Sequence, residues 1–137
     1  MNKFKPVLIA LLLVLTASAA FAQEAAPQQP APQKTTYTGD AVIVAYNINK
    51  DKDADYEQVI AKVKAALQKS ARPEAKEQLA GWKIIKNSTP QPDGTSVYVH
   101  VINPVVKGAD YSLTNIVYEG ATDEEKLAFY NLYKGAL

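Results

Sequence analysis

The chain contains one histidine, His100, and no cysteine, so the chemistry that either residue type could perform is narrowly bounded. His100 lies in an alternating run, residues 96–103, in which Tyr98 and His100 share one face of an expected strand. Tyr46 and Trp82 lie on two other expected strands. We expect these aromatic side chains to meet around His100, in a cavity that suits a small apolar or aromatic ligand or a proton-transfer step. The alternative is a histidine packed in the core and hydrogen-bonded there.

A turn beyond this strand adds two more candidates. Asp110 and Tyr111 follow Gly108, and turns at the mouth of a pocket often carry function. Asp110 could instead cap the helix that we expect next. The candidate pocket comprises Tyr46, Trp82, Tyr98, His100, Asp110 and Tyr111.

The sequence contains none of the other common catalytic, nucleotide-binding or metal-binding motifs. One histidine without a cysteine cannot form a His-based or thiolate metal site. The sequence lacks a G-x-S-x-G elbow, a P-loop, a dinucleotide fingerprint and a calcium loop. It therefore indicates no catalytic residue, no metal and no cofactor, and we lean towards a protein that is not an enzyme.

The first 22 residues have the pattern of a cleavable signal peptide. Lys3 and Lys5 form a basic start, an apolar run covers residues 7–15, and the small residues Ala20 and Ala22 allow cleavage before residue 23. We therefore expect export, to the periplasm or outside the cell. No later apolar run is long enough to span a membrane, so we expect no membrane span in the mature form.

Residues 23–36 are rich in Gln, Pro and Ala and contain no large apolar residue, so we expect a disordered linker before a single domain at 37–137. Removal of Lys3 and Lys5 from the 15 basic residues leaves 13 against 14 acidic ones. Arg72 is the only arginine, and the lysines are scattered. Because nucleic-acid binding requires a basic stripe, we expect no nucleic-acid partner.

The domain begins with an apolar, β-branched segment at 41–48 that predicts a strand. Asp53 is the expected N-cap of a helix that ends near Ser70. Pro73 is expected to open a short second helix, at 73–78. The apolar stripe of the first helix comprises Tyr56, Val59, Ile60, Val63 and Leu67.

Two further strands are expected at 81–86 and 96–103, joined as a hairpin by a loop rich in proline and glycine. Residues 113–118 fit either a short helix or an edge strand. The sequence from Thr122 to Glu125 is a capping box that opens a last helix through Tyr133, with Gly135 as its stop. The expected buried side of this helix comprises Leu127, Phe129, Tyr130 and Tyr133.

The order strand-helix-strand-strand-helix-helix predicts an α+β domain of the split β-α-β kind. Helices on one face of a small sheet leave its other face open, yet the expected strands are apolar on both faces. We therefore expect a homodimer in which a second copy covers the open face, sheet against sheet. The alternative is that the C-terminal helices wrap across it.

The element order and the two-faced sheet of residues 41–102 resemble the dimeric α+β barrel superfamily of ferredoxin-like domains. That superfamily includes small monooxygenases and haem-degrading enzymes. The segment from Val101 to Tyr111 resembles a group of small exported bacterial proteins of unknown function. The chain departs from the superfamily pattern because it has no obvious fourth strand after the last helix, so no catalytic residue is carried over.

These observations favour a non-catalytic exported module that binds a small ligand or a protein. One alternative is a cofactor-free oxygenase or haem-handling enzyme, with His100, Trp82 and Tyr98 around the substrate. The other is a structural protein of the cell envelope, held away from a surface by the linker.

Overall fold

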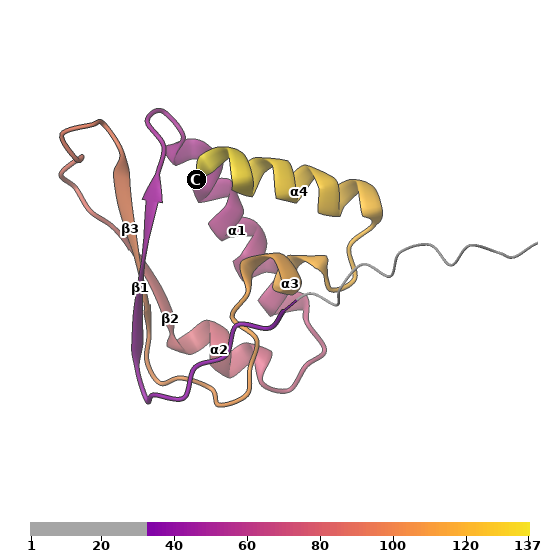
Figure 1. Cartoon of the computed structure of the whole chain (residues 1–137). Coiled ribbons are helices and arrows are strands. Elements are labelled where there is room, and N and C mark those ends of the chain that lie inside the picture. Colours follow the sequence, from indigo (N-terminus) through magenta and orange to yellow (C-terminus); the bar gives the residue numbers. More distant parts are fainter. Residues whose placement is uncertain (1–32) are drawn as a thin grey trace, which may run out of the picture. The chain divides into compact units, whose positions relative to one another are not determined.

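A computed structural model describes residues 33–137 of the chain (Figure 1). The expected signal peptide, and the expected linker up to residue 32, lie outside the described residues. The described part is an α+β domain with a three-stranded antiparallel sheet and four helices. Its elements are β1 (Val42–Ile48), α1 (Asp53–Lys69), α2 (Ala75–Gly81), β2 (Trp82–Lys86), β3 (Ser96–Ile102), α3 (Leu113–Tyr118) and α4 (Asp123–Ala136).

The sheet has the strand order β1-β3-β2, with β3 antiparallel to both neighbours. The expected hairpin between β2 and β3 is confirmed. Because β3 lies between them, β1 and β2 run parallel to each other and are joined through α1 and α2, as in a split β-α-β unit. Val44 of β1 and Ile84 of β2 both pair with His100, so His100 is near the middle of the sheet.

The helices lie on one face of the sheet (Figure 1). The apolar stripe expected on α1 is confirmed, because Tyr56, Val59, Val63 and Leu67 are buried and Ile60 is half-buried. Every second residue of the strands, such as Ile48 of β1 and Ile102 of β3, points towards that stripe and packs with it in the core. Alternation along a strand sends every second side chain to the opposite face.

The opposite face of the sheet, which we call the outer face, is largely apolar, and no other element of residues 33–137 covers it. Ile43 is 69% exposed and Ile85 is 55% exposed. The C-terminal helices do not wrap across this face, because α3 and α4 pack against α1 on the helical side. The alternative based on wrapping is therefore wrong. The outer face comprises Ile43, Ala45 and Asn47 of β1, Lys83 and Ile85 of β2, and Val97, Val99 and Val101 of β3.

The start of α1 differs from the expectation. Lys52 occupies the N-cap position and makes no capping hydrogen bond, so the prediction of Asp53 as N-cap is wrong. Asp53 is instead the first helical residue, and its carboxylate accepts a hydrogen bond from Ser96 Oγ at 3.1 Å and pairs with Lys86 Nζ at 3.1 Å. The carboxylate therefore fastens α1 to β3 and β2. The local sequence around Asp53 does not reveal these partners, because both lie on strands that come later in the chain.

The second and third helices settle two open points. The helix α2 begins at Ala75, two residues later than expected from Pro73, and runs on to Gly81. Residues 113–118 form a helix and not an edge strand. Its N-cap is Ser112, whose hydroxyl accepts a hydrogen bond from the Asn115 amide at 3.4 Å.

The last helix confirms its predicted start but not its end. Thr122 and Glu125 form the expected capping box, with hydrogen bonds of 3.3 and 2.8 Å. Gly135 does not stop α4, which continues to Ala136, and the Ala136 carbonyl accepts a hydrogen bond from the Asn49 amide at 2.8 Å. This tertiary contact holds the last turn. Phe129 is buried and Tyr133 half-buried, whereas Leu127 and Tyr130 are 61% and 42% exposed, so their expected burial is wrong.

Gly81, where α2 meets β2, tests the tightness of this packing. A Cβ at Gly81 would lie 2.7 Å from the Pro104 carbonyl oxygen, whereas a Cβ at Gly135 would meet nothing within 4 Å. Gly81→Ala should therefore destabilise the domain by about 1–3 kcal/mol. Gly135→Ala, the control within α4, should stabilise it by roughly 0.5–1 kcal/mol. Urea denaturation measures both, and equal free energies of unfolding for the two variants would contradict the packing at Gly81.

Candidate functional site

His100 is the centre of a buried aromatic cluster between the sheet and α1. Its side chain is 1% exposed. Tyr46 of β1 pairs with Tyr98, and Trp82 of β2 pairs with Ile102, so Tyr46 and Trp82 are both diagonal neighbours of His100 on the inner face. The ring of Tyr46 lies 4.6 Å from the His100 ring, and the Trp82 ring lies 5.7 Å from it.

Both ring nitrogens of His100 have a hydrogen-bond partner. Trp82 Nε1 donates to His100 Nδ1 at 3.2 Å, and His100 Nε2 lies 3.0 Å from the hydroxyl oxygen of Tyr56 on α1. An indole N–H can only donate, so Nδ1 must carry a lone pair. A neutral imidazole then carries its proton on Nε2 and donates it to Tyr56. The tautomer of His100 is fixed by Trp82.

The surroundings of His100 keep the ring neutral. Burial, and to a smaller degree the positive charge of Lys64, lowers the pKa of His100 from 6.5 to about 4. A second proton would also have to enter Nδ1, where the Trp82 N–H already points. In this packing no lone pair of His100 is free to take a proton from a substrate or to bind a metal.

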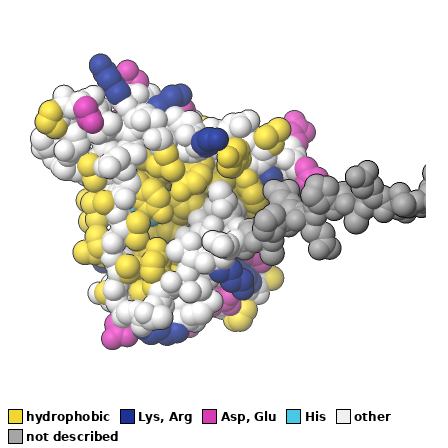
Figure 2. All heavy atoms as spheres, viewed as in Figure 1, with side chains coloured by type: hydrophobic (Ala, Val, Ile, Leu, Met, Phe, Trp, Pro, Cys, Tyr) yellow, Lys and Arg dark blue, Asp and Glu magenta, His cyan; other side chains and the backbone are white. Residues whose placement is uncertain are grey.

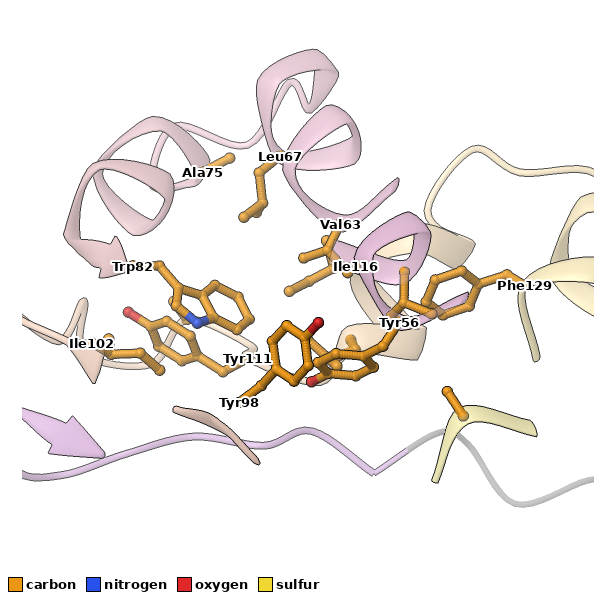
Figure 3. Packing of buried hydrophobic residues seen from close by; sticks show 14 of the residues in the cluster. Tyr56, Val63, Leu67, Ala75, Trp82, Tyr98, Ile102, Tyr111, Ile116 and Phe129 are labelled. Carbon is orange, nitrogen blue, oxygen red and sulfur yellow. The ribbon is translucent and has the colours of Figure 1, made fainter. Parts of the chain in front are cut away.

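The cluster extends on both sides of His100 through edge-to-face and tilted ring contacts. Figure 3 shows the rings of Trp82, Tyr111, Tyr98 and Tyr56 in a row. Val63 and Leu67 of α1 lie above this row in the same view. Trp82 and Tyr111 have ring centroids 5.4 Å apart, and Tyr56 and Tyr98 have theirs 4.9 Å apart. These rings fill the space between the sheet and α1 by contacting one another.

The surroundings of Tyr46, Tyr56 and Tyr98 raise the pKa values of their hydroxyls. Burial raises the pKa of Tyr46 to about 12, and burial also raises the pKa values of Tyr56 and Tyr98. The Tyr98 hydroxyl donates to Glu57 Oε1 at 3.2 Å. All three phenols are therefore protonated at neutral pH.

Five of the six candidate pocket residues thus come together. Tyr46, Trp82, Tyr98, His100 and Tyr111 belong to this one cluster, where they contact each other and, apart from half-buried Tyr46, are at most 7% exposed.

Asp110, the sixth candidate, has a different environment. Its carboxylate accepts hydrogen bonds from the Thr35 amide at 3.0 Å, the Ser112 amide at 2.9 Å and Asn115 Nδ2 at 2.8 Å. Asp110 therefore joins the start of α3 to the segment before β1, although Ser112 and not Asp110 is the N-cap. It also borders a surface hollow of about 260 Å³, whose charged lining residues include Lys34, Arg72 and Glu119.

The segment at 33–36, which the composition assigned to the linker, takes part in this contact. The Tyr111 amide donates to the Thr35 carbonyl at 2.7 Å, and Asn115 Nδ2 donates to the Gln33 carbonyl at 3.1 Å. The ring of Tyr37 lies 5.4 Å from that of Tyr111. The chain is therefore fastened to α3 from Gln33 onwards.

Sequence reasoning missed Tyr56 and Gln78. Tyr56 opens the apolar stripe of α1, and nothing in that stripe indicates that its hydroxyl would meet a histidine 44 positions later. Gln78 of α2 is fully buried, and its Nε2 donates to the Asp110 carbonyl at 2.6 Å while its Oε1 has no hydrogen-bond partner. Gln78 is the polar member of the buried positions of α2, with Ala75 and Gly81 as the other two, and a polar side chain gives no hydrophobic signal of burial.

Two larger hollows lie away from the aromatic cluster. One, of about 580 Å³, lies between the C-terminal half of α1 and the turn from α3 to α4, with alanines and Phe129 in its lining. The other, of about 430 Å³, lies at one end of the outer face, where Asn47 and Val97 meet the loop between β2 and β3. Neither is lined by His100.

Comparison with known proteins supplies no relative from which to transfer a role. No family model, no curated protein and no solved structure matches this chain. Within residues 33–137, no helix is long and apolar enough to cross a membrane. The same residues contain no cluster of three metal-binding side chains of the His, Cys, Asp or Glu type.

His100 should make the stability of the domain pH-dependent. The folded state binds this proton only near pH 4, whereas the unfolded state binds it near pH 6.5, so stability is full above pH 6.5 and falls as the pH drops towards 4. Between pH 7 and pH 5 we expect a loss of about 2 kcal/mol from this group. Urea denaturation at both pH values measures the loss, and His100→Phe is the control, because it should remove most of that difference. An equal difference in the variant would contradict the assignment.

The hydrogen bond from His100 to Tyr56 can be tested separately. Tyr56→Phe keeps the ring but leaves the buried Nε2–H without an acceptor, which should cost about 1–3 kcal/mol of folding stability. Tyr130→Phe on the exposed side of α4 is the matched control and should change stability by less than about 0.5 kcal/mol. Thermal or urea unfolding at pH 7 compares the two, and similar losses in both would argue against a buried bond.

Proposed function

We propose that this protein is an exported, non-catalytic binding module that acts as a homodimer, with the two copies joined through the outer faces of their sheets. The observation that carries this proposal is the uncovered apolar outer face, with Ile43 69% and Ile85 55% exposed. Apolar surface of this kind on a small sheet marks an interaction site or an aggregation hazard. The export rests on the signal-like sequence at 1–22.

The strand register arranges the outer face in three rows. The middle row, Ala45-Val99-Ile85, has no charge and no hydrogen-bonding side chain. One flanking row ends in Lys83, and the other contains Asn47 and Val97. An uncharged centre with polar groups towards the ends is the usual anatomy of a protein interface.

A second copy complements these rows when the two-fold axis lies midway between the two sheets, parallel to them and perpendicular to the strands. The row that begins with Ile43 then lies over the Asn47 and Val97 end of the second copy. That end has the hollow of about 430 Å³, which offers room for the protruding Ile43 side chain. Lys83 at the same time approaches the end of the sheet that carries the loop with Asp93.

The area of the outer face sets the affinity that we expect for the dimer. Three strands about 4.8 Å apart, each with five residues at about 3.4 Å, span roughly 15 by 17 Å, or about 250 Å². Stable interfaces bury about 800 Å² on each partner. We therefore expect a weak dimer, with a dissociation constant in the micromolar range or above.

The aromatic cluster favours a protein partner over a small ligand. A small apolar or aromatic ligand at His100 would have to displace rings that already contact one another. The oxygenase or haem-handling alternative needs a free nitrogen on His100, and both nitrogens are engaged by Trp82 and Tyr56. The proposed module therefore binds through its surface, and its aromatic cluster serves stability.

The same proposal includes the finer fold assignment. The strand order β1-β3-β2, with β1 and β2 parallel, is compatible with the first three strands of a ferredoxin-like sheet. A fourth strand beside β1 is missing from the described residues. We infer a ferredoxin-like domain that lacks this strand.

The homodimer can be tested with one substitution on each side of the domain. Ile85→Lys places a charge in the middle row of the outer face and should weaken dimerisation at least about tenfold, because burial of two isoleucines is lost and two charges are added. Leu127→Lys, at a position 61% exposed on α4, is the matched control and should leave the dimer unchanged. Sedimentation equilibrium of residues 23–137 gives the dissociation constants. A monomer at millimolar concentration, or equal effects of both variants, would refute the proposal.

A further inference from the structure

The hollow of about 580 Å³ on the helical side of the domain, between the C-terminal half of α1 and the turn from α3 to α4, has a fixed apolar lining. We call it the helical hollow. Its lining includes Ala66 and Val117, which are half-buried, and Phe129, which is buried. Contacts with Tyr133 and Tyr118, at 6.1 and 6.3 Å between ring centroids, hold the Phe129 ring. Pockets for small molecules have volumes of about 300–1,000 Å³ and mostly apolar linings, so the helical hollow has room for a small ligand.

Short side chains on both walls keep the helical hollow open. Lys62, Ala65 and Lys69 line it from α1, and their spacing of three and seven positions puts them on one face of that helix. Gly120 and Ala121 line it from the turn between α3 and α4. A Cβ at Gly120 would meet nothing within 4 Å. The two walls therefore pack at their ends without filling the space between them.

Apolar surface alone does not mark a ligand site in this domain. Figure 2 shows hydrophobic side chains gathered between the sheet and the helices, on the face where β1 lies in front (Figure 1). The helical hollow differs from that open area because it is enclosed by α1, α3 and α4 and because charged side chains border it. The state of those charges therefore decides which ligand fits.

The two acidic side chains of the lining are engaged within the fold. Glu119 Oε2 accepts a hydrogen bond from Arg72 Nε at 2.8 Å and forms an ion pair with it. Glu125 Oε2 accepts a hydrogen bond from the Thr122 amide at 2.8 Å, in the capping box of α4. Neither carboxylate is left to bind a cationic ligand without loss of a contact that holds α3 or α4.

The two lysines of the lining are not engaged in this way. Within residues 33–137, neither Lys62 nor Lys69 forms an ion pair with a carboxylate. Their charges still act at the helical hollow: hydrogen bonds from Thr122 are the main cause of the lowered pKa of Glu125, and Lys62 and Lys69 lower it further. Seven residues at 1.5 Å each place the two lysines about 10 Å apart along α1. The rim of the helical hollow thus carries two unpaired positive charges.

We propose that the helical hollow binds a small apolar monocarboxylate, such as a medium-chain fatty acid. The apolar body of the ligand packs against Ala66 and Val117, and its carboxylate pairs with Lys62 or Lys69. A cationic ligand would be repelled by these lysines, and an uncharged one would leave them unpaired. Glu125 beside the lysines opposes a head group of higher negative charge, such as a phosphate.

This inference gives the proposed binding module a ligand class and does not depend on its homodimer. The helical hollow contains no residue of the outer face. His100 and its aromatic cluster do not line it either, so the ligand displaces none of the rings that contact one another there. Ligand binding and dimerisation therefore occupy separate surfaces and can fail separately.

The test titrates residues 23–137, labelled with ¹⁵N, with octanoate, octanol and octylamine at pH 7. Octanoate should shift the amide signals of the helical hollow saturably, with a dissociation constant of roughly 1 mM. Octanol should bind at least about threefold more weakly, and octylamine should not bind. Lys62→Glu and Lys69→Glu should each weaken octanoate binding about threefold to tenfold, because an attractive charge becomes a repulsive one. Lys76→Glu, at an exposed position on α2 outside the hollow, is the matched control and should change nothing.

A second pair of variants tests the shape of the site. Ala65→Leu places a larger side chain in the helical hollow and should weaken octanoate binding at least about tenfold. Ala61→Leu, at an exposed position on the same helix outside the lining, is its control and should bind octanoate as the unsubstituted chain does. Thermal unfolding of both variants shows that each is folded.

Several outcomes would overturn the proposal. They are the absence of saturable octanoate binding, octanol binding as tightly as octanoate, and octanoate binding that neither lysine reversal weakens. Shifts at the helical hollow that follow protein concentration and not octanoate would assign it to contacts between copies instead. Ile85→Lys should leave octanoate binding unchanged: a loss would move the ligand to the outer face, whereas unchanged binding in a chain that never dimerises would refute the homodimer alone.

Discussion

A sheet of three strands has two faces and two edges, and the helices of this domain cover one face alone. That constraint decides which side chains are buried. On β3, Tyr98 and His100 are buried below the helices, whereas Val97 and Val99 on the opposite side are only half-buried. Burial of an apolar side chain contributes about 1.5–3 kcal/mol. The covered face therefore stabilises the monomer, and the uncovered face is the surface that we propose for contacts between molecules.

The covered face is held by polar contacts as well as by apolar ones. His100 connects three elements, since its own strand, Trp82 of β2 and Tyr56 of α1 meet at its two nitrogens. A buried polar ring is costly unless its donors and acceptors are satisfied. Because both are satisfied, the ring orders the core without carrying a charge. The same arrangement leaves it no spare lone pair, which is why we favour binding over catalysis.

The uncovered surfaces are unequal in charge. Lys83 and Lys86 lie on the edge strand β2, whereas the edge strand β1 carries no charged residue. Lysines on an exposed edge oppose the addition of another strand. The middle row of the outer face is uncharged, so a contact between two outer faces would be stabilised mainly by burial of Ile43, Val99 and Ile85.

Much of the fold follows from the sequence alone, because local pattern and local chemistry decide it. The alternation in residues 96–103 predicts β3, the stripe from Tyr56 to Leu67 predicts α1, and the capping box at Thr122 predicts the start of α4. Local pattern also shows that the sheet is apolar on both faces. Of the candidate pocket, the strand alternation brings Tyr46, Trp82, Tyr98 and His100 to one face.

Only the tertiary structure decides the points that depend on distant partners. Asp53 fastens α1 to Ser96 and Lys86 where a capping role was expected, and α4 runs past Gly135 because Asn49 binds the Ala136 carbonyl. Tyr56 became the partner of His100, and Asp110 joined a separate network at α3. A hydrogen bond between residues 44 positions apart leaves no periodic trace in the sequence. Local periodicity therefore determined the elements and their faces, whereas packing across the chain determined their ends and the partners of each polar group.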